Sequence, residues 1–196
     1  MPSLPTLRLA LRAVPILLAS LAVGCGDDVV APAYVGKVTD SDAVVGMVSD
    51  GERLQLYLCG GPETYARYTR WFQGPIAADG TFSIESGGFV AEGDLARGGG
   101  TVRTDDGQTL SWSVTPADSA LGGLYAAMDG SCRTGAVVGD FDGDGELDLQ
   151  GTWCNGKDVF AQVTPLLPIA LTDRGVRVSV QIDPPKVLFV DRVRAP

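Results

Sequence analysis

Besides two pairs at 142–145, five Asp-Gly or Asn-Gly pairs recur along the chain at intervals that suit short β-strands. Such pairs tolerate the positive backbone φ values of a tight hairpin turn, which most residues resist. The pairs are Asp50-Gly51, Asp79-Gly80, Asp106-Gly107, Asp129-Gly130 and Asn155-Gly156. A chain with this many short turns is expected to fold into antiparallel strands that are joined by hairpins.

Apolar and polar residues alternate between these turns, which is the pattern of a strand with one buried face. A helix signal occurs only at 62–72, and its apolar residues do not recur every three or four positions, so we predict a short turn and then a strand over 68–72. The sequence therefore predicts an all-β fold, an antiparallel hairpin meander that forms a sandwich or a small barrel. The clearest predicted strands are 44–48, 53–58, 81–85, 108–114, 176–182 and 186–194.

The N-terminus has the features of an export signal. Arg8 and Arg12 precede an uncharged apolar run over 13–23, which is shorter than the roughly 20 residues of a membrane-spanning helix. The run ends in Leu-Ala-Val-Gly and then Cys25, and this segment resembles the lipobox of bacterial lipoproteins. An ordinary secretory signal with a chance cysteine is the alternative.

The resemblance implies that residues 1–24 are a lipoprotein signal peptide and that Cys25 becomes the lipidated first residue. Several acyl chains on one residue suffice for stable anchoring, so the expected partner is a membrane. Gly26 follows the lipid site, and by the same resemblance it favours the outer membrane of the cell envelope over the inner one. The expected organisation is the signal peptide, a lipidated Cys and tether over 25–40, and a single antiparallel β-domain over 41–196.

Charge and composition exclude several classes of function. Residues 1–24 contain two of the 15 basic residues, so 13 basic and 24 acidic residues remain, for a net charge of −11. Such a chain repels nucleic acid and anionic lipid headgroups. The chain has no histidine, which excludes Ser-His-Asp and Cys-His catalysis and histidine-ligated zinc.

An acidic loop is the sharpest candidate site. The segment 140–148 reads D-F-D-G-D-G-E-L-D, so acids alternate with other residues, and calcium prefers six to eight oxygen ligands. The segment resembles the calcium loops of FG-GAP and VCBS repeats. That resemblance implies side-chain ligands from Asp140, Asp142, Asp144 and Asp148, and a backbone carbonyl ligand from Glu146. The alternative is a plain polar turn, although five carboxylates in nine residues repel one another when no cation is present.

Three cysteines remain beyond Cys25, and an exported protein can form disulfides. Cys132 and Cys154 lie 11 residues on either side of Gly143. If the acidic loop closes a symmetric hairpin, these two cysteines face each other across adjacent strands, at the spacing of a disulfide. Cys59 is then expected to be free and buried.

No catalytic residue is marked by the sequence. Our first hypothesis is a non-enzymatic, lipid-anchored envelope domain with a structural or binding role and an unknown protein or glycan partner. The alternative is a carboxylate-dependent envelope hydrolase that acts on carbohydrate, which requires two carboxyls roughly 5 to 9 Å apart in a cleft with aromatic walls. The tryptophans Trp71, Trp112 and Trp153 could line such a face, but residues of this kind are more often part of the core.

Overall fold

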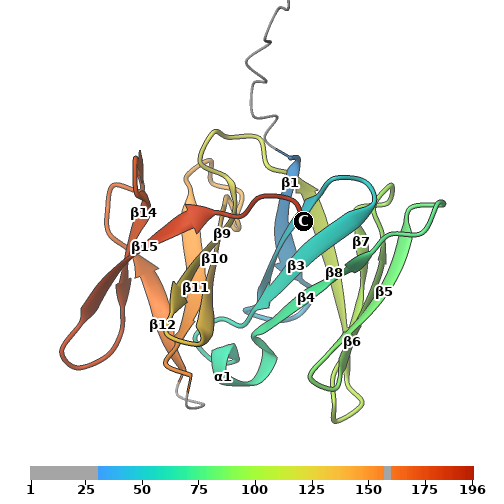
Figure 1. Ribbon diagram of the computed structural model, residues 1–196, viewed down its shortest axis with the longest axis horizontal. Coiled ribbons are helices and arrows are strands. Elements are labelled where there is room, and N and C mark those ends of the chain that lie inside the picture. The colour runs from blue at the N-terminus through green and yellow to red at the C-terminus, as the bar shows by residue number, and fades with distance from the viewer. Residues whose placement is uncertain (1–30, 157–159) are drawn as a thin grey trace, which may run out of the picture.

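The computed structural model describes residues 31–156 and 160–196. Almost all regular structure in it is antiparallel strand, which confirms the predicted all-β class. The strands form two curled sheets that stand side by side (Figure 1). The signal peptide and Cys25 lie outside the described residues.

The eight-stranded sheet has the strand order β4-β3-β2-β1-β8-β7-β6-β5. Its two edge strands curl toward each other, since a Cβ added at Gly74 of β4 would lie only 2.8 Å from Ile84 of β5. The sheet therefore encloses its own apolar core, which includes Phe72, Phe89 and Trp112. Its strands are β1 (Ala33–Val38), β2 (Val44–Ser49), β3 (Arg53–Cys59), β4 (Arg70–Pro75), β5 (Thr81–Ser86), β6 (Phe89–Asp94), β7 (Gly99–Arg103) and β8 (Thr109–Pro116).

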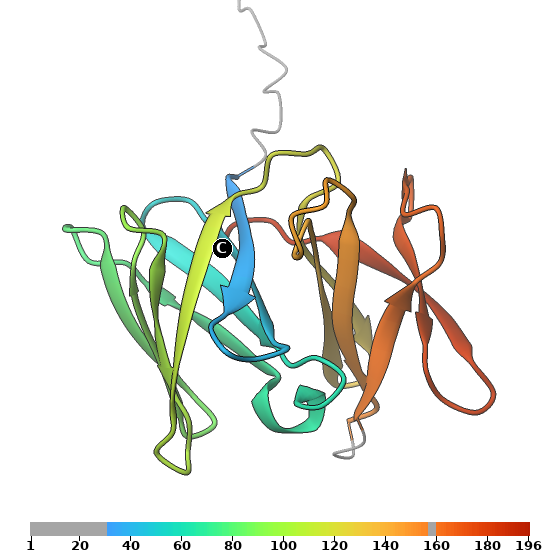
Figure 2. The same cartoon turned by 180° about the vertical axis from the view of Figure 1, so that it is seen from behind.

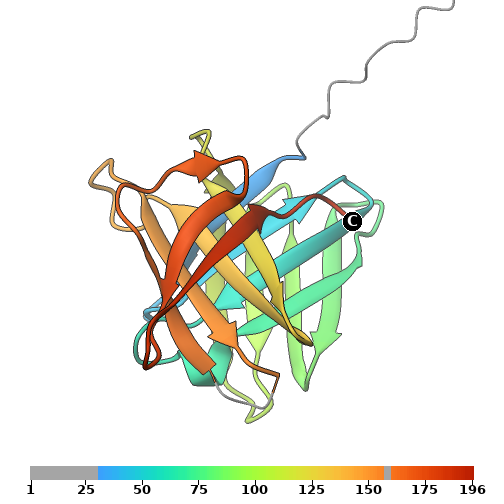
Figure 3. The ribbon, with the colours of Figure 1, turned by 60° about the vertical axis from the view of Figure 1, so that its left-hand side comes forward.

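The seven-stranded sheet has the order β12-β11-β10-β9-β15-β14-β13, and β12 also pairs with β14. Six of its strands thus form a closed ring around a second core, which includes Tyr125, Trp153 and Val178. Figure 3 shows the strands of this ring turned toward the viewer. Its strands are β9 (Gly123–Asp129), β10 (Cys132–Gly139), β11 (Asp148–Cys154), β12 (Phe160–Pro165), β13 (Leu171–Thr172), β14 (Gly175–Val180) and β15 (Lys186–Arg192).

A third apolar cluster joins the two sheets. Every residue of β2 is buried, because one face of this strand covers the first core and the other packs on β9 and β10. At the centre of the contact the fully buried ring of Tyr57 lies on Gly135, where an added Cβ would be 2.4 Å from the ring carbon Cζ. The side chain of Gln150 also crosses the contact, and its Nε2 donates to the carbonyl of Cys59 at 3.0 Å.

Two local predictions require correction. The tether expected over 25–40 includes residues 33–38, which form β1 between β2 and β8 in the middle of the eight-stranded sheet. The segment 62–72 contains a one-turn helix, α1 (Tyr65–Tyr68), and β4 begins only at Arg70. The first difference arises from pairing with the distant strand β8, which local alternation does not reveal. In the second, β4 begins where its pairing with β3 begins, at Leu58 and Arg70.

Candidate functional site

The acidic loop connects β10 to β11 and is shaped by its own carboxylates. Asp140 accepts hydrogen bonds from the backbone N–H of Gly143 at 2.7 Å and of Gly145 at 3.0 Å. Both glycines have positive φ, 82° and 88°, a conformation that only glycine adopts without strain. The side chain of Asp140 therefore sits at the centre of a loop that wraps around it.

Asp142 and Asp144 turn toward the same region. Each accepts a hydrogen bond from the N–H two residues later, at 3.3 Å and 2.8 Å respectively. One carboxylate oxygen from each of Asp140, Asp142 and Asp144 lies within 4.8 Å of the others, and all three residues are exposed. This arrangement offers a hard cation several oxygen ligands with open access from solvent.

Asp148 and Glu146 have different positions from these three. The carboxylate of Asp148 accepts a hydrogen bond from Phe141 N–H at 3.2 Å, which closes the base of the loop, and it is not part of the carboxylate triplet. Glu146 was expected to offer its backbone carbonyl, and its carboxylate also lies outside the triplet. The structure thus brings together three of the four predicted side-chain ligands.

Two apolar residues fix the loop to the body of the protein. Phe141 packs against the cluster between the sheets, and Leu147 packs against the core of the seven-stranded sheet. These contacts hold both ends of the loop that carries the three carboxylates.

The structure joins Cys132 to Cys154 in a disulfide, with Cα atoms 5.8 Å apart, which is the pairing that the sequence indicated. The predicted symmetry is off by one residue. Gly139 pairs with Asp148, so the centre of the hairpin lies after Gly143 and the two cysteines are not directly opposite. The paired residues of β10 and β11 stop at Gly135–Thr152, and the disulfide joins the strands beyond that point.

Cys59 is free and fully buried in the contact between the sheets. Its Sγ lies 3.7 Å from Thr152 Oγ1. Burial raises the pKa of the Cys59 thiol to about 11, so at neutral pH the sulfur carries its proton. A nucleophilic cysteine requires the opposite shift.

The aromatic side chains do not form an exposed binding face. Trp112 and Trp153 are buried in the two cores. Trp71 is half-buried, with its ring 4.4 Å from that of Tyr57 and the guanidinium of Arg133 3.7 Å from its other face. The structure therefore places these residues in packing roles.

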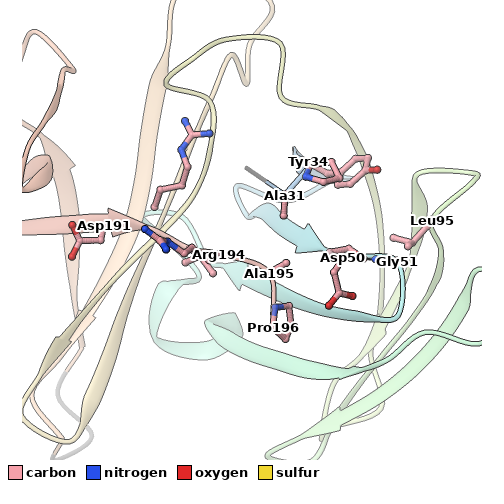
Figure 4. Close-up of a pocket in the computed structure, with 13 residues that line it drawn as sticks. Ala31, Tyr34, Asp50, Gly51, Leu95, Asp191, Arg194, Ala195 and Pro196 are labelled. Carbon is pink, nitrogen blue, oxygen red and sulfur yellow. Dashed lines mark hydrogen bonds between the residues drawn. The ribbon is translucent and has the colours of Figure 1, made fainter. Parts of the chain in front are cut away.

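A cleft of about 1010 Å³ lies between the sheets and is bordered by the C-terminal segment 191–196 (Figure 4). Its lining includes two side-chain carboxyl groups, those of Asp50 and Asp191, and the C-terminal segment runs between them (Figure 4). Asp50 accepts hydrogen bonds from the N–H groups of Arg53 and Glu52, which hold its pKa below the usual range.

This cleft lacks the features of a glycosidase. A general acid needs a raised pKa, whereas Asp50 has a lowered one. Tyr34 is the single aromatic residue among the described residues that line the cleft. No sequence signal marked this cleft, because its residues come from four segments that meet only after folding. The geometry thus gives no support to the hydrolase alternative.

The described part of the chain contains no helix with the length and apolar character needed to cross a bilayer. Comparison with protein-family models, with curated proteins and with solved structures finds no match to this chain.

Proposed function

We propose that this chain is a lipid-anchored protein of the cell envelope, with a β-domain that has a structural or binding role and is stabilised by calcium in the acidic loop. Two kinds of observation support the proposal. The lipobox-like segment before Cys25 supports export and anchoring. The convergence of Asp140, Asp142 and Asp144 within 4.8 Å is the observation that carries the calcium assignment.

The cysteines agree with an exported location. The disulfide between Cys132 and Cys154 is of the kind that persists in oxidising compartments. The third cysteine, Cys59, is buried and has a raised pKa, so it is protected from oxidation and from thiol exchange.

The anchor is tested by replacing Cys25 with Ala in the full chain. We expect the variant to lose labelling by radioactive fatty acid and to leave the membrane fraction after export. The matched control is Cys59→Ala, which removes a cysteine that is not expected to carry lipid. A Cys25→Ala variant that still sediments with washed membranes contradicts the anchor.

The calcium site is tested by thermal unfolding of the full acylated protein in non-ionic detergent. A ligand that binds only the folded state stabilises it by RT ln(1 + [L]/Kd), about 2.7 kcal/mol at 100 times Kd. For a chain of this size each kcal/mol raises the melting temperature by about 2–4 °C, so calcium should raise it by about 5–10 °C. Magnesium should have a smaller effect, because it prefers a tighter octahedron and keeps its waters.

Two comparisons separate a calcium site from a plain acidic turn. Asp142→Asn with Asp144→Asn should abolish most of the calcium effect, whereas Glu52→Gln with Glu63→Gln removes two exposed carboxylates elsewhere and should preserve it. If the loop is a plain turn, sodium at matched ionic strength screens the repulsion between its carboxylates as well as calcium does, and raises the melting temperature equally. Equal shifts in calcium and sodium therefore refute the site.

A further inference from the structure

The connection between β12 and β13 is an exposed apolar loop. Residues 165–171 read P-L-L-P-I-A-L, without a charged or hydrogen-bonding side chain. The side chain of Leu167 is 80% exposed and that of Leu171 is 50% exposed, while Ile169 packs against the core of the seven-stranded sheet. Single exposed leucines are common on protein surfaces, but an uninterrupted apolar loop tip indicates a contact surface. We refer to residues 165–171 as the apolar loop.

The apolar loop lies at the end of the molecule where β1 begins. Gly123 at the start of β9 is close to Ala33, since a Cβ added at Gly123 would be 3.4 Å from that of Ala33. Strands β9 to β12 then run alternately away from this end and back to it, and β12 finishes there at Pro165. Figures 1 and 2 show the hairpin of β13 and β14 at the same end as the start of β1.

The short distance to Cys25 brings this end near a membrane. Six peptide units separate Cys25 from Ala31, the first described residue, and a chain spans at most about 3.5 Å per residue, or roughly 20 Å in total. If Cys25 carries lipid, the end that bears the apolar loop lies no farther from the bilayer than the length of this segment. This step rests on the anchor proposed above.

We propose that the apolar loop contacts the surface of the bilayer and inserts Leu167 and Leu171 among the lipid headgroups. The lipid anchor and the apolar loop would then hold the domain in one orientation, because it would contact the bilayer at two separate points. The contact is apolar, so it does not conflict with the net charge of −11, which disfavours electrostatic binding to anionic lipid. For the same reason it should not be weakened by salt.

The other exposed large apolar side chains provide a matched control. Met128 and Val187 are 66% and 48% exposed. Each is next to a charged residue, Asp129 or Lys186, and these two form an ion pair. Lys186 pairs with Val180, the last residue of β14, whereas Leu171 of the apolar loop pairs with Val176 near the start of that strand, so Val187 is expected to lie farther from the bilayer than the tip of the loop.

The experiment places a tryptophan either in the apolar loop or at the start of β15. Full acylated protein carrying Leu167→Trp or Val187→Trp is reconstituted into phosphatidylcholine vesicles, with or without lipid brominated on the acyl chain near the headgroup. Bromine quenches tryptophan only at close range. Wild-type protein gives the background from its native tryptophans. We expect the emission added at position 167 to fall at least twofold in brominated vesicles, and to do so equally in high salt. The emission added at position 187 should be unchanged.

The outcomes distinguish the loop contact from the anchor. If the protein floats with the vesicles and this depends on Cys25, but position 167 is not quenched, the loop contact is wrong and the anchor stands. Equal quenching at positions 167 and 187 also overturns the contact, because it shows no preferred orientation. If acylation is absent and the protein does not float, the anchor fails and the loop contact fails with it.

Discussion

The disulfide between Cys132 and Cys154 allows a stability prediction with a worked magnitude. These residues are 22 positions apart, and the bond closes the β10–β11 hairpin together with the acidic loop. In the chain-entropy relation, a loop of this length removes about 11 cal/mol/K from the unfolded state, or about 3 kcal/mol at 25 °C. For a chain of this size, loss of the bond should lower the melting temperature by about 6–12 °C.

The assay compares wild type with a Cys132→Ala, Cys154→Ala double variant by thermal unfolding, with and without reductant. Alanine is chosen because Cys154 is buried, and a hydroxyl there would add an unsatisfied polar group. Reductant should lower the melting temperature of the wild type toward that of the variant and leave the variant unchanged. The reasoning is refuted if reductant has no effect on the wild type, or if peptide mapping links Cys59 to either partner.

Three further predictions concern the contact between the sheets and its surroundings. Gly135→Ala should destabilise the protein by about 1–3 kcal/mol in denaturant unfolding, because the new Cβ meets the immobile ring of Tyr57; an unchanged midpoint contradicts this packing. Cys59 should resist iodoacetamide in the folded protein at pH 8 and react after unfolding, as followed by mass spectrometry, since burial raises its pKa to about 11; rapid labelling of folded protein shows that the contact opens. The ammonium of Lys186 donates to Asp129 and lowers the pKa of that carboxyl, so this stabilisation is present above about pH 4 and is lost as the pH falls through the lower folded-state pKa. The melting temperature of Asp129→Asn should therefore fall less between pH 4 and pH 2 than that of wild type, and parallel curves would exclude the effect.

Features that depend on a few neighbouring residues could be predicted from the sequence. The glycines of the five turn pairs all have positive φ, as their hairpin turns require. Strands such as β3 and β5 follow the predicted ranges to within a residue, because alternation alone marks a strand, although β3 is buried on both faces and only β5 on one. The convergence of Asp140, Asp142 and Asp144 was also predictable, because it arises within one short loop.

Other features were decided by residues far apart in the chain. Nothing local in residues 33–38 shows that they lie between β2 and β8, since β1 is held there by partners up to about 80 positions away. Alternation within a strand indicates that one face is buried, but it does not indicate which strands that face packs against. The division into two sheets and the burial of both faces of β2 were therefore not predictable. The same holds for the position of the apolar loop at the end of the molecule where β1 begins. Turn and strand preferences act over a few bonds and are written in the sequence, whereas the choice of partner for each apolar face depends on the packing of the whole chain.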